Sequence, residues 1–176
     1  MKRFAVVVVV LLSVSLIGLG FAYGEEGAWG GRILRKNAAG GVSGGSAHGV
    51  KGARGGAGST RGFATDGQGN VVGGSASVVK TPSGARGARM GGFTRSSDGT
   101  VQHRSGMAVS GQRGSAASTG SFTRGASGDV SGQRSTSATS SSGASYQGNT
   151  TYSKGSGASH TATCRDASGN AVSCAK

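Results

Sequence analysis

Large apolar residues in the second half of the chain recur at intervals of about thirty residues. Four aromatic side chains are separated by 30, 29 and 30 positions, and they are Phe63, Phe93, Phe122 and Tyr152. A valine follows each phenylalanine eight residues later, at Val71, Val101 and Val130. His160 occupies the corresponding place in the fourth copy, and the spacing returns between Cys164 and Val172. A period of this length indicates an array of like units that bury surface against their neighbours.

Turn-forming residues separate each aromatic residue from its valine. The runs are rich in Asp, Gly, Ser and Asn, and they are 66–70, 96–99, 125–129 and 166–170. Ser, Thr and Ala alternate through 135–140, and Thr161 and Thr163 alternate with His160, Ala162 and Cys164, which is the period of two expected for strands. We therefore predict an all-β fold of tandem β-hairpins of about 30 residues, array-like or solenoid-like, in which each aromatic residue faces its valine across the turn. Low hydrophobicity combined with high net charge also predicts substantial disorder.

The N-terminus has the pattern of an export signal. Lys2 and Arg3 precede an apolar run over 4–19, and small residues follow it. We predict a signal peptide at 1–24, with cleavage after Gly24 or else after Ala22. A retained membrane anchor is the alternative, but about sixteen apolar residues fall short of the roughly 20 that span a bilayer. The protein is then exported to the periplasm, the cell surface or the extracellular space.

The exported chain divides by composition into three segments. Residues 25–39 form a short head that contains Trp29, Ile33 and Leu34, and it is either a docking peptide or an unstructured remnant. Residues 40–60 are rich in glycine and are predicted to be a linker. The hairpin repeats occupy 61–176.

Composition excludes a conventional hydrophobic core. Gly, Ser and Thr provide 78 of the 176 residues, and only 22 large apolar residues follow position 24. The Gly-x-Ser-x-Gly pattern at 41–45 lies in glycine-rich sequence with no strand and helix predicted around it. The three histidines, His48, His103 and His160, have no carboxylate or cysteine at ligand spacing. We therefore expect no enzyme, no catalytic or metal site, no cofactor and no small-molecule substrate.

The two cysteines, Cys164 and Cys174, favour a disulfide that closes a C-terminal hairpin. A turn centred on Gly169 would place them opposite each other, whereas a turn centred on Ser168 would place Cys164 opposite Val172. Metal binding by this pair lacks the close paired spacing of zinc sites.

The charge is strongly basic and dispersed. The 19 Lys and Arg residues outnumber the 6 Asp and Glu residues, which gives a formal net charge of +13, or +11 without Lys2 and Arg3. The candidate polyanion-binding residues begin at nine-residue intervals and are Arg86, Arg95, Arg104, Arg113, Arg124, Arg134 and Lys154. Every aspartate lies in a predicted turn, so hairpins would place acids at their tips and cations along their sides. Such an arrangement suits extracellular DNA, lipopolysaccharide or acidic polysaccharide, unless the charge only keeps the chain soluble.

A limited resemblance accompanies these features. The aromatic-hydroxyl-basic triplets at 93–95, 122–124 and 152–154, with their Asp, Gly and Asn turns, resemble the loose group of Gly/Ser/Thr-rich repeat proteins that many bacteria export. That resemblance implies no activity. We expect a non-enzymatic cell-surface or matrix protein that binds polyanions, with a membrane-active cationic protein or a self-associating fibre subunit as alternatives.

Overall fold

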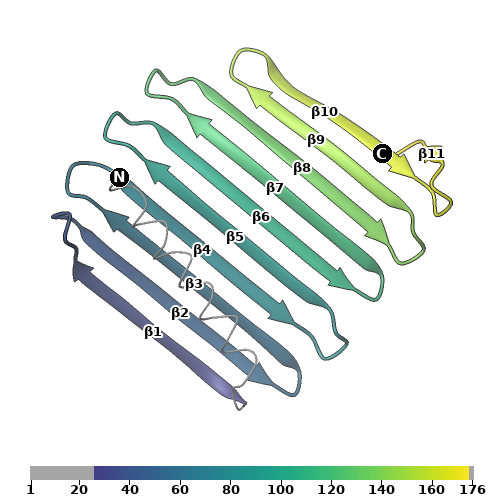
Figure 1. Cartoon of the computed structure of the whole chain (residues 1–176), viewed down its shortest axis with the longest axis horizontal. Coiled ribbons are helices and arrows are strands. Elements are labelled where there is room, and N and C mark those ends of the chain that lie inside the picture. Colours follow the sequence, from purple (N-terminus) through teal and green to yellow (C-terminus); the bar gives the residue numbers. More distant parts are fainter. Residues whose placement is uncertain (1–25, 175–176) are drawn as a thin grey trace.

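The computed structural model describes residues 26–174, which form one antiparallel sheet. Each strand pairs with its neighbours in sequence, so the eleven strands run in a simple up-and-down meander (Figure 1). The strands are β1 (Gly27–Lys36), β2 (Val42–Gly52), β3 (Gly55–Thr65), β4 (Val71–Lys80), β5 (Arg86–Arg95), β6 (Val101–Gly111), β7 (Gly114–Arg124), β8 (Val130–Ser140), β9 (Ser145–Ser153), β10 (Gly157–Arg165) and β11 (Ala171–Val172). The predicted all-β array of hairpins is confirmed. The longest irregular connection between Gly27 and Val172 is a five-residue turn, so the expected disorder is not seen there.

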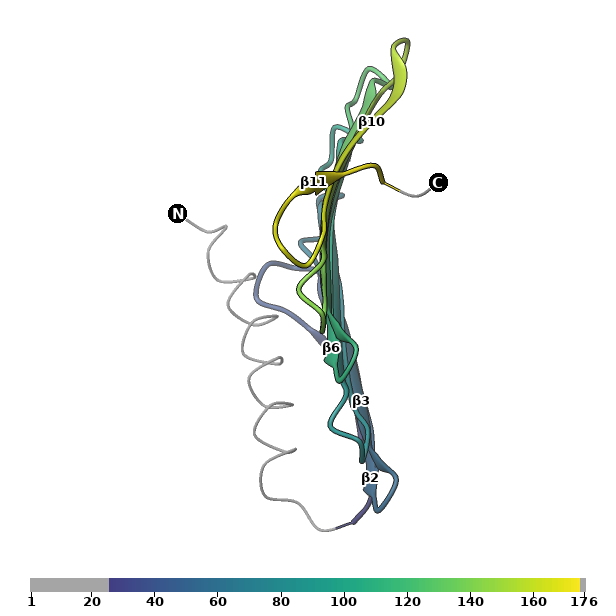
Figure 2. The ribbon, with the colours of Figure 1, turned by 90° about the vertical axis from the view of Figure 1, so that its right-hand side faces the viewer.

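The strands form a single layer with both faces open, as the edge-on view in Figure 2 shows. No large side chain among residues 26–174 is fully buried. Four glycines and Ser118 are the buried residues of this part of the chain. The layer is therefore held by its backbone hydrogen bonds and by contacts between neighbouring side chains on each face. Within the described residues, no helix is long and apolar enough to cross a membrane.

Seven turns share one five-residue geometry. In each, the first residue donates its N–H to the carbonyl oxygen of the fifth, as Ser96 does to Thr100 at 2.9 Å. The fourth residue is always glycine with φ between 79° and 95°, and these glycines are Gly40, Gly69, Gly84, Gly99, Gly128, Gly143 and Gly169. Side chains other than Asn and Asp rarely adopt this left-handed conformation, so glycine at the fourth place fixes where each strand ends.

This turn geometry corrects the predicted pairing of aromatic residues with valines. Val71 lies opposite Thr65, the last residue of β3, and Phe63 lies opposite Gly73. Phe93 and Phe122 are likewise displaced by two residues from Val101 and Val130. The prediction centred each turn on its second residue, whereas a five-residue turn closed by the fourth-place glycine is centred on its third. Each aromatic residue and its valine consequently share a face as diagonal neighbours.

The predicted head and linker between residues 25 and 60 are strands of the sheet. Residues 25–39 contain β1, and the predicted linker at 40–60 contains β2 and the first half of β3. Leu34 precedes Phe63 by 29 residues and lies in the same row of the sheet, so the supposed head is the first unit of the array. Glycine-rich sequence pairs here because glycine supplies backbone hydrogen bonds as well as any other residue. The predicted signal peptide at 1–24 lies outside the described residues.

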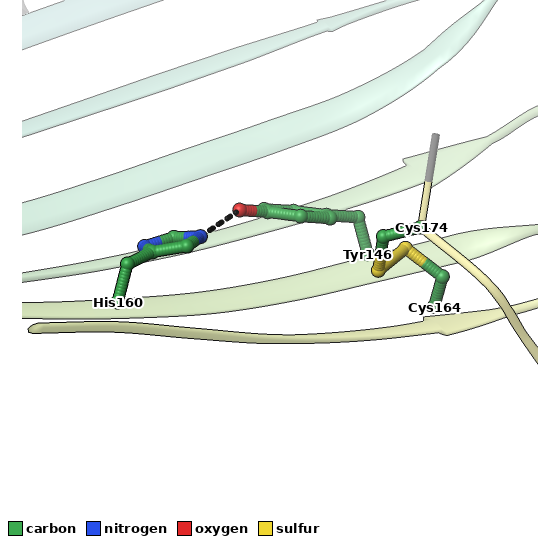
Figure 3. Close-up of a disulfide and its surroundings, with 4 residues drawn as sticks. All are labelled: Tyr146, His160, Cys164 and Cys174. Carbon is green, nitrogen blue, oxygen red and sulfur yellow. Dashed lines mark hydrogen bonds between the residues drawn. A yellow bond between two sulfur atoms is a disulfide. The ribbon is translucent and has the colours of Figure 1, made fainter. Parts of the chain in front are cut away.

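The predicted disulfide between Cys164 and Cys174 is present, with a Cα–Cα distance of 5.3 Å. Cys164 lies opposite Val172, so the turn is centred on Ser168. Tyr146 of β9 lies opposite Cys164 on the other side, and its ring extends from the disulfide toward His160 (Figure 3). The bridge ties β11 to the end of β10.

Candidate functional site: the aromatic and cationic rows

The register assigns every strand residue to one of two faces, because paired residues share a face and successive residues alternate. The face that carries Phe63, Phe93, Phe122 and Tyr152 is here named the aromatic face. The opposite face is named the hydroxyl face, since β7 to β10 present mainly Ser, Thr, Asn and Gln side chains there. The two faces therefore differ in chemistry although one repeat generates both.

A continuous row of alternating large and small residues crosses the aromatic face. In order from β1 to β10 the row is Leu34, Gly44, Phe63, Gly73, Phe93, His103, Phe122, Gly132, Tyr152 and Ala158. We call it the aromatic row. Odd-numbered strands supply the large side chains, and even-numbered strands supply Gly or Ala except at His103.

The glycines let the rings lie against the sheet. A Cβ atom added to Gly73 would lie 2.6 Å from Cε1 of Phe93, and one added to Gly44 would lie 3.0 Å from Cε1 of Phe63. The four aromatic residues are 41 to 44% exposed, which is nearly constant along the row. The rings of Phe63 and Phe93 thus cover a glycine of the neighbouring strand, and all four aromatic residues remain partly open to solvent.

A second row of the aromatic face lies two residues from the aromatic row, and it alternates valines with Lys or Arg except on β3, where Thr65 replaces the cation. The pairs run Lys36 with Val42, then Thr65 with Val71, and then Arg95, Val101, Arg124 and Val130 in succession. Lys154 continues the row after β9, where its backbone N–H donates to the carbonyl of Val130 at 2.8 Å. We call Lys36, Arg95, Arg124 and Lys154 the cation row. Neighbouring strands lie about 4.8 Å apart, so cations on alternate strands are spaced by about 10 Å.

The seven candidate polyanion-binding residues do not share one surface. Arg95, Arg124, Arg134 and Lys154 lie on the aromatic face. Arg86 and Arg104 lie on the hydroxyl face, because nine is an odd interval and reverses the face both within β5, from Arg86 to Arg95, and across the five-residue turn, from Arg95 to Arg104. Arg113 lies in the two-residue turn between β6 and β7, at the other end of the strands from the cation row.

Two further arginines flank the aromatic row on its other side. Arg134 donates from Nε to Oγ of Ser118 at 2.9 Å, and that hydroxyl is buried and also bonded to the carbonyl of Ser135. Arg61 makes the equivalent bond to Ser46 at 3.1 Å. These hydrogen bonds hold both guanidinium groups along the sheet, so cations border the rings on both sides.

In the described chain every aspartate lies in a turn and Glu26 precedes β1, so no carboxylate lies within a strand. Three turns at the same end of the strands contain Asp66, Asp98 and Asp129, while Asp166 lies at the other end. A hydrogen bond from the Asn70 side chain, and others from backbone N–H groups, lower the pKa of Asp66. The backbone and side chain of Asn170 likewise lower the pKa of Asp166. These two carboxylates accept hydrogen bonds within their own turns. The cations in the described strands have no acidic residue on the same strand.

The hydroxyl face has a shallow concavity of about 700 Å³ across β3 to β8. Gly62, Gly74 and Gly92 form its floor, and Met90, Arg104 and Gln133 are among the side chains beside it.

Residues 26–174 hold no group of three His, Cys, Asp or Glu side chains that could bind a metal ion. Near the disulfide, the Tyr146 hydroxyl lies 3.4 Å from Nε2 of His160 (Figure 3).

The period of about thirty residues identifies the aromatic residues of the row but not the small residues between them. A glycine follows three of the five large residues by ten positions, in Leu34 to Gly44, Phe63 to Gly73 and Phe122 to Gly132, while His103 holds this place after Phe93. That interval is the signal for the row, and it would also have brought Leu34 into the repeat. Comparison with known proteins adds no relative, since no family model, curated protein or solved structure matches the chain.

Proposed function

We propose that this chain is an exported, non-enzymatic protein of the cell surface or extracellular matrix whose aromatic face binds extended polyanions. The observation that carries the proposal is the cation row, in which Arg95, Arg124 and Lys154 recur at every second strand, while Lys36 lies four strands before Arg95 because Thr65 occupies the row on β3. No carboxylate in the described strands opposes them. A disulfide persists in oxidising compartments, which supports export.

The row would bind by releasing counterions from the polymer. Arg95, Arg124 and Lys154 are spaced by about 10 Å, and Lys36 lies about 20 Å from Arg95; both distances reach the Debye length at physiological salt, so each cation acts nearly independently. Four contacts predict a slope of about −3.6 when the logarithm of the binding constant for double-stranded DNA is plotted against the logarithm of salt concentration. Binding of this kind is strong at low salt and independent of sequence.

The test measures retention of the oxidised protein on double-stranded DNA and on lipopolysaccharide over a series of salt concentrations. We expect the triple variant Arg95→Gln, Arg124→Gln, Lys154→Gln to reduce the magnitude of the DNA slope by about 3. The matched control removes three exposed cations from the hydroxyl face, Lys80→Gln, Arg86→Gln and Arg104→Gln. Equal loss in both variants would show that net charge alone is responsible. Absence of binding by the parent protein at low salt would refute the proposal.

The open edges of the sheet favour a second candidate, a self-associating fibre subunit. All ten residues of β1 are exposed, and its outer edge has no partner among the described strands. The outer edge of β10 pairs with β11 only at Cys164 and Arg165. Unpaired edges are templates for another chain. If β1 of a second copy continued the meander beyond β10, Leu34 would lie beside Ala158 and preserve the alternation of large and small residues.

Sedimentation velocity over a range of protein concentrations tests this second candidate. Leu34→Lys places a charge at the proposed joint and should abolish concentration-dependent growth. Met90→Lys is the matched control, because Met90 is 57% exposed but lies on β5, away from either edge. A parent protein that stays monomeric throughout, or growth that survives Leu34→Lys, would exclude assembly through these edges.

A further inference from the structure

We infer that the polyanion is an acidic polysaccharide with about one charged group per two sugars, lying across the strands along the aromatic and cation rows. This inference rests on the proposed function and identifies its ligand class. It uses the rings, which a purely electrostatic site does not need.

The aromatic-hydroxyl-basic triplet places a ring and a cation side by side on one face. Phe93 and Arg95, Phe122 and Arg124, and Tyr152 and Lys154 are each two residues apart, about 7 Å along the strand. The middle residues, Thr94, Thr123 and Ser153, point to the hydroxyl face. One ring and one cation therefore recur together about every 10 Å across the sheet.

The rings have the form of stacking platforms. Gly73 lies against the Phe93 ring and Gly44 against the Phe63 ring, and the four aromatic residues are each 41 to 44% exposed. Such a surface accepts the apolar C–H face of a pyranose ring or the plane of a nucleobase. A polymer without flat or apolar units would gain nothing from it.

Charge density separates the two kinds of polymer. A nucleic acid strand carries one phosphate per about 3.4 Å, roughly three times the linear density of the cation row. An extended glycan with one carboxylate per disaccharide has a repeat comparable to the distance between alternate strands. Each disaccharide could then place one sugar on a ring and its carboxylate beside Arg95, Arg124 or Lys154.

Cations on the far side of the rings reinforce this track. Arg61 and Arg134 are held along the sheet by hydrogen bonds to Ser46 and Ser118. Arg61 lies two residues before Phe63 on β3, and Arg134 lies opposite Gly120, which is two residues before Phe122 on β7. Their guanidinium groups retain N–H donors for hydroxyl or carboxylate oxygens of the sugars. The rings are thus bordered by donors on both sides.

The experiment measures affinity for three probes of equal contour length by titration calorimetry at one salt concentration. The probes are hyaluronan oligosaccharide, with one carboxylate per disaccharide, the neutral oligomer of N-acetylglucosamine, and single-stranded DNA. We expect hyaluronan to bind most tightly at physiological salt. The decisive variant is Phe93→Leu, Phe122→Leu, Tyr152→Leu, since leucine is already tolerated in this row at Leu34 beside Gly44.

Loss of three stacking rings should weaken hyaluronan binding about 30-fold or more, at threefold to tenfold per ring. Tyr146→Leu is the matched control, because Tyr146 lies on the same face but in a different row, and it should leave affinity unchanged. The inference is overturned if the triple variant binds as tightly as the parent, or if single-stranded DNA binds more tightly than hyaluronan. In either case salt-dependent binding of DNA or lipopolysaccharide would leave the proposed function standing, whereas failure of every polyanion at low salt would remove both. Sedimentation of each variant shows whether a changed affinity instead reflects a second copy occupying the face.

Discussion

The contact between Phe93 and Gly73 provides the sharpest test of how a sheet without a core is held together. Gly73 is buried, and an added Cβ atom would lie 2.6 Å from Cε1 and 3.0 Å from Cζ of Phe93. The variant Gly73→Ala therefore forces the ring to tilt away from the sheet.

The size of the effect follows from the burial of the ring. Phe93 is 41% exposed, so about 120 Å² of roughly 200 Å² is buried, worth about 3 kcal/mol at 25 cal/mol per Å². A tilt that exposes half of this area costs about 1.5 kcal/mol. Alanine returns about 0.5 to 1 kcal/mol through its lower entropy in the unfolded chain. We expect a net destabilisation of about 0.5 to 1 kcal/mol.

Gly91→Ala is the matched control. Gly91 lies on β5 in the same face, but an added Cβ atom would meet only ordinary contacts at 3.6 Å or more. This substitution should stabilise the protein by about 0.5 to 1 kcal/mol. The two glycine variants should thus differ by about 1 to 2 kcal/mol, with opposite signs.

Urea unfolding followed by circular dichroism measures both variants, and amide hydrogen exchange in β4 and β5 shows whether the change is local. Local measurement is needed because the stability of an array is distributed over its units. In a Phe93→Ala background, Gly73→Ala should no longer be destabilising, since the obstructing ring is gone. Equal effects of Gly73→Ala and Gly91→Ala in the parent would refute the packing of ring against glycine.

Three further predictions concern the turns and the disulfide. Gly99→Ala should destabilise the β5–β6 hairpin by about 1 to 2 kcal/mol, because Gly99 has φ of 87° and open space around it; Gly99→Asn should cost less, as measured by hydrogen exchange. Because the pKa of Asp166 is lowered on folding, its carboxylate stabilises the turn above the unfolded value of 3.8, and this stabilisation is lost as the pH falls through the folded pKa. Acid should therefore loosen the β10–β11 turn in the parent protein but much less in Asp166→Asn, as followed by NMR. Replacing both Cys164 and Cys174 with Ser removes about 3 kcal/mol of loop-closure stabilisation and should release β11, with faster exchange confined to the end of β10; protection lost across the whole sheet would contradict this.

The sequence was sufficient for the repeat and its hairpins, but not for their register. Phe63, Phe93 and Phe122 with their valines revealed the period, yet the position of each turn depends on which glycine adopts positive φ. Gly67 and Gly69 both have positive φ in the turn at 66–70, and spacing alone does not say which of them ends that turn. A shift of two residues preserved the face of every side chain, so the aromatic residues and valines were still placed on one surface.

The candidate site was predicted in part for the same reason. Arg95, Arg124 and Lys154 belong to triplets, which fix the face of the cation relative to the ring. Arg86 and Arg104 were selected together with Arg95 by a nine-residue interval, which reverses the face within β5 and has no fixed relation to a sheet face once turns of different lengths intervene. The face of a cation is decided by its distance from the nearest turn, so regular spacing along the chain was misleading.

The abundance of glycine has a different meaning in this sheet from its usual one. Glycine ordinarily weakens strands, because it adds entropy to the unfolded chain and no side chain to the folded one. At Gly44 and Gly73, the missing side chain is the space into which Leu34, Phe63 and Phe93 fit. Apolar area is buried against backbone within one layer, in the way that aromatic residues compensate for neighbouring glycines in sheets. A second layer is then unnecessary for packing, and the outer sides of the rings stay open beside the cation row, where a long polymer can reach them.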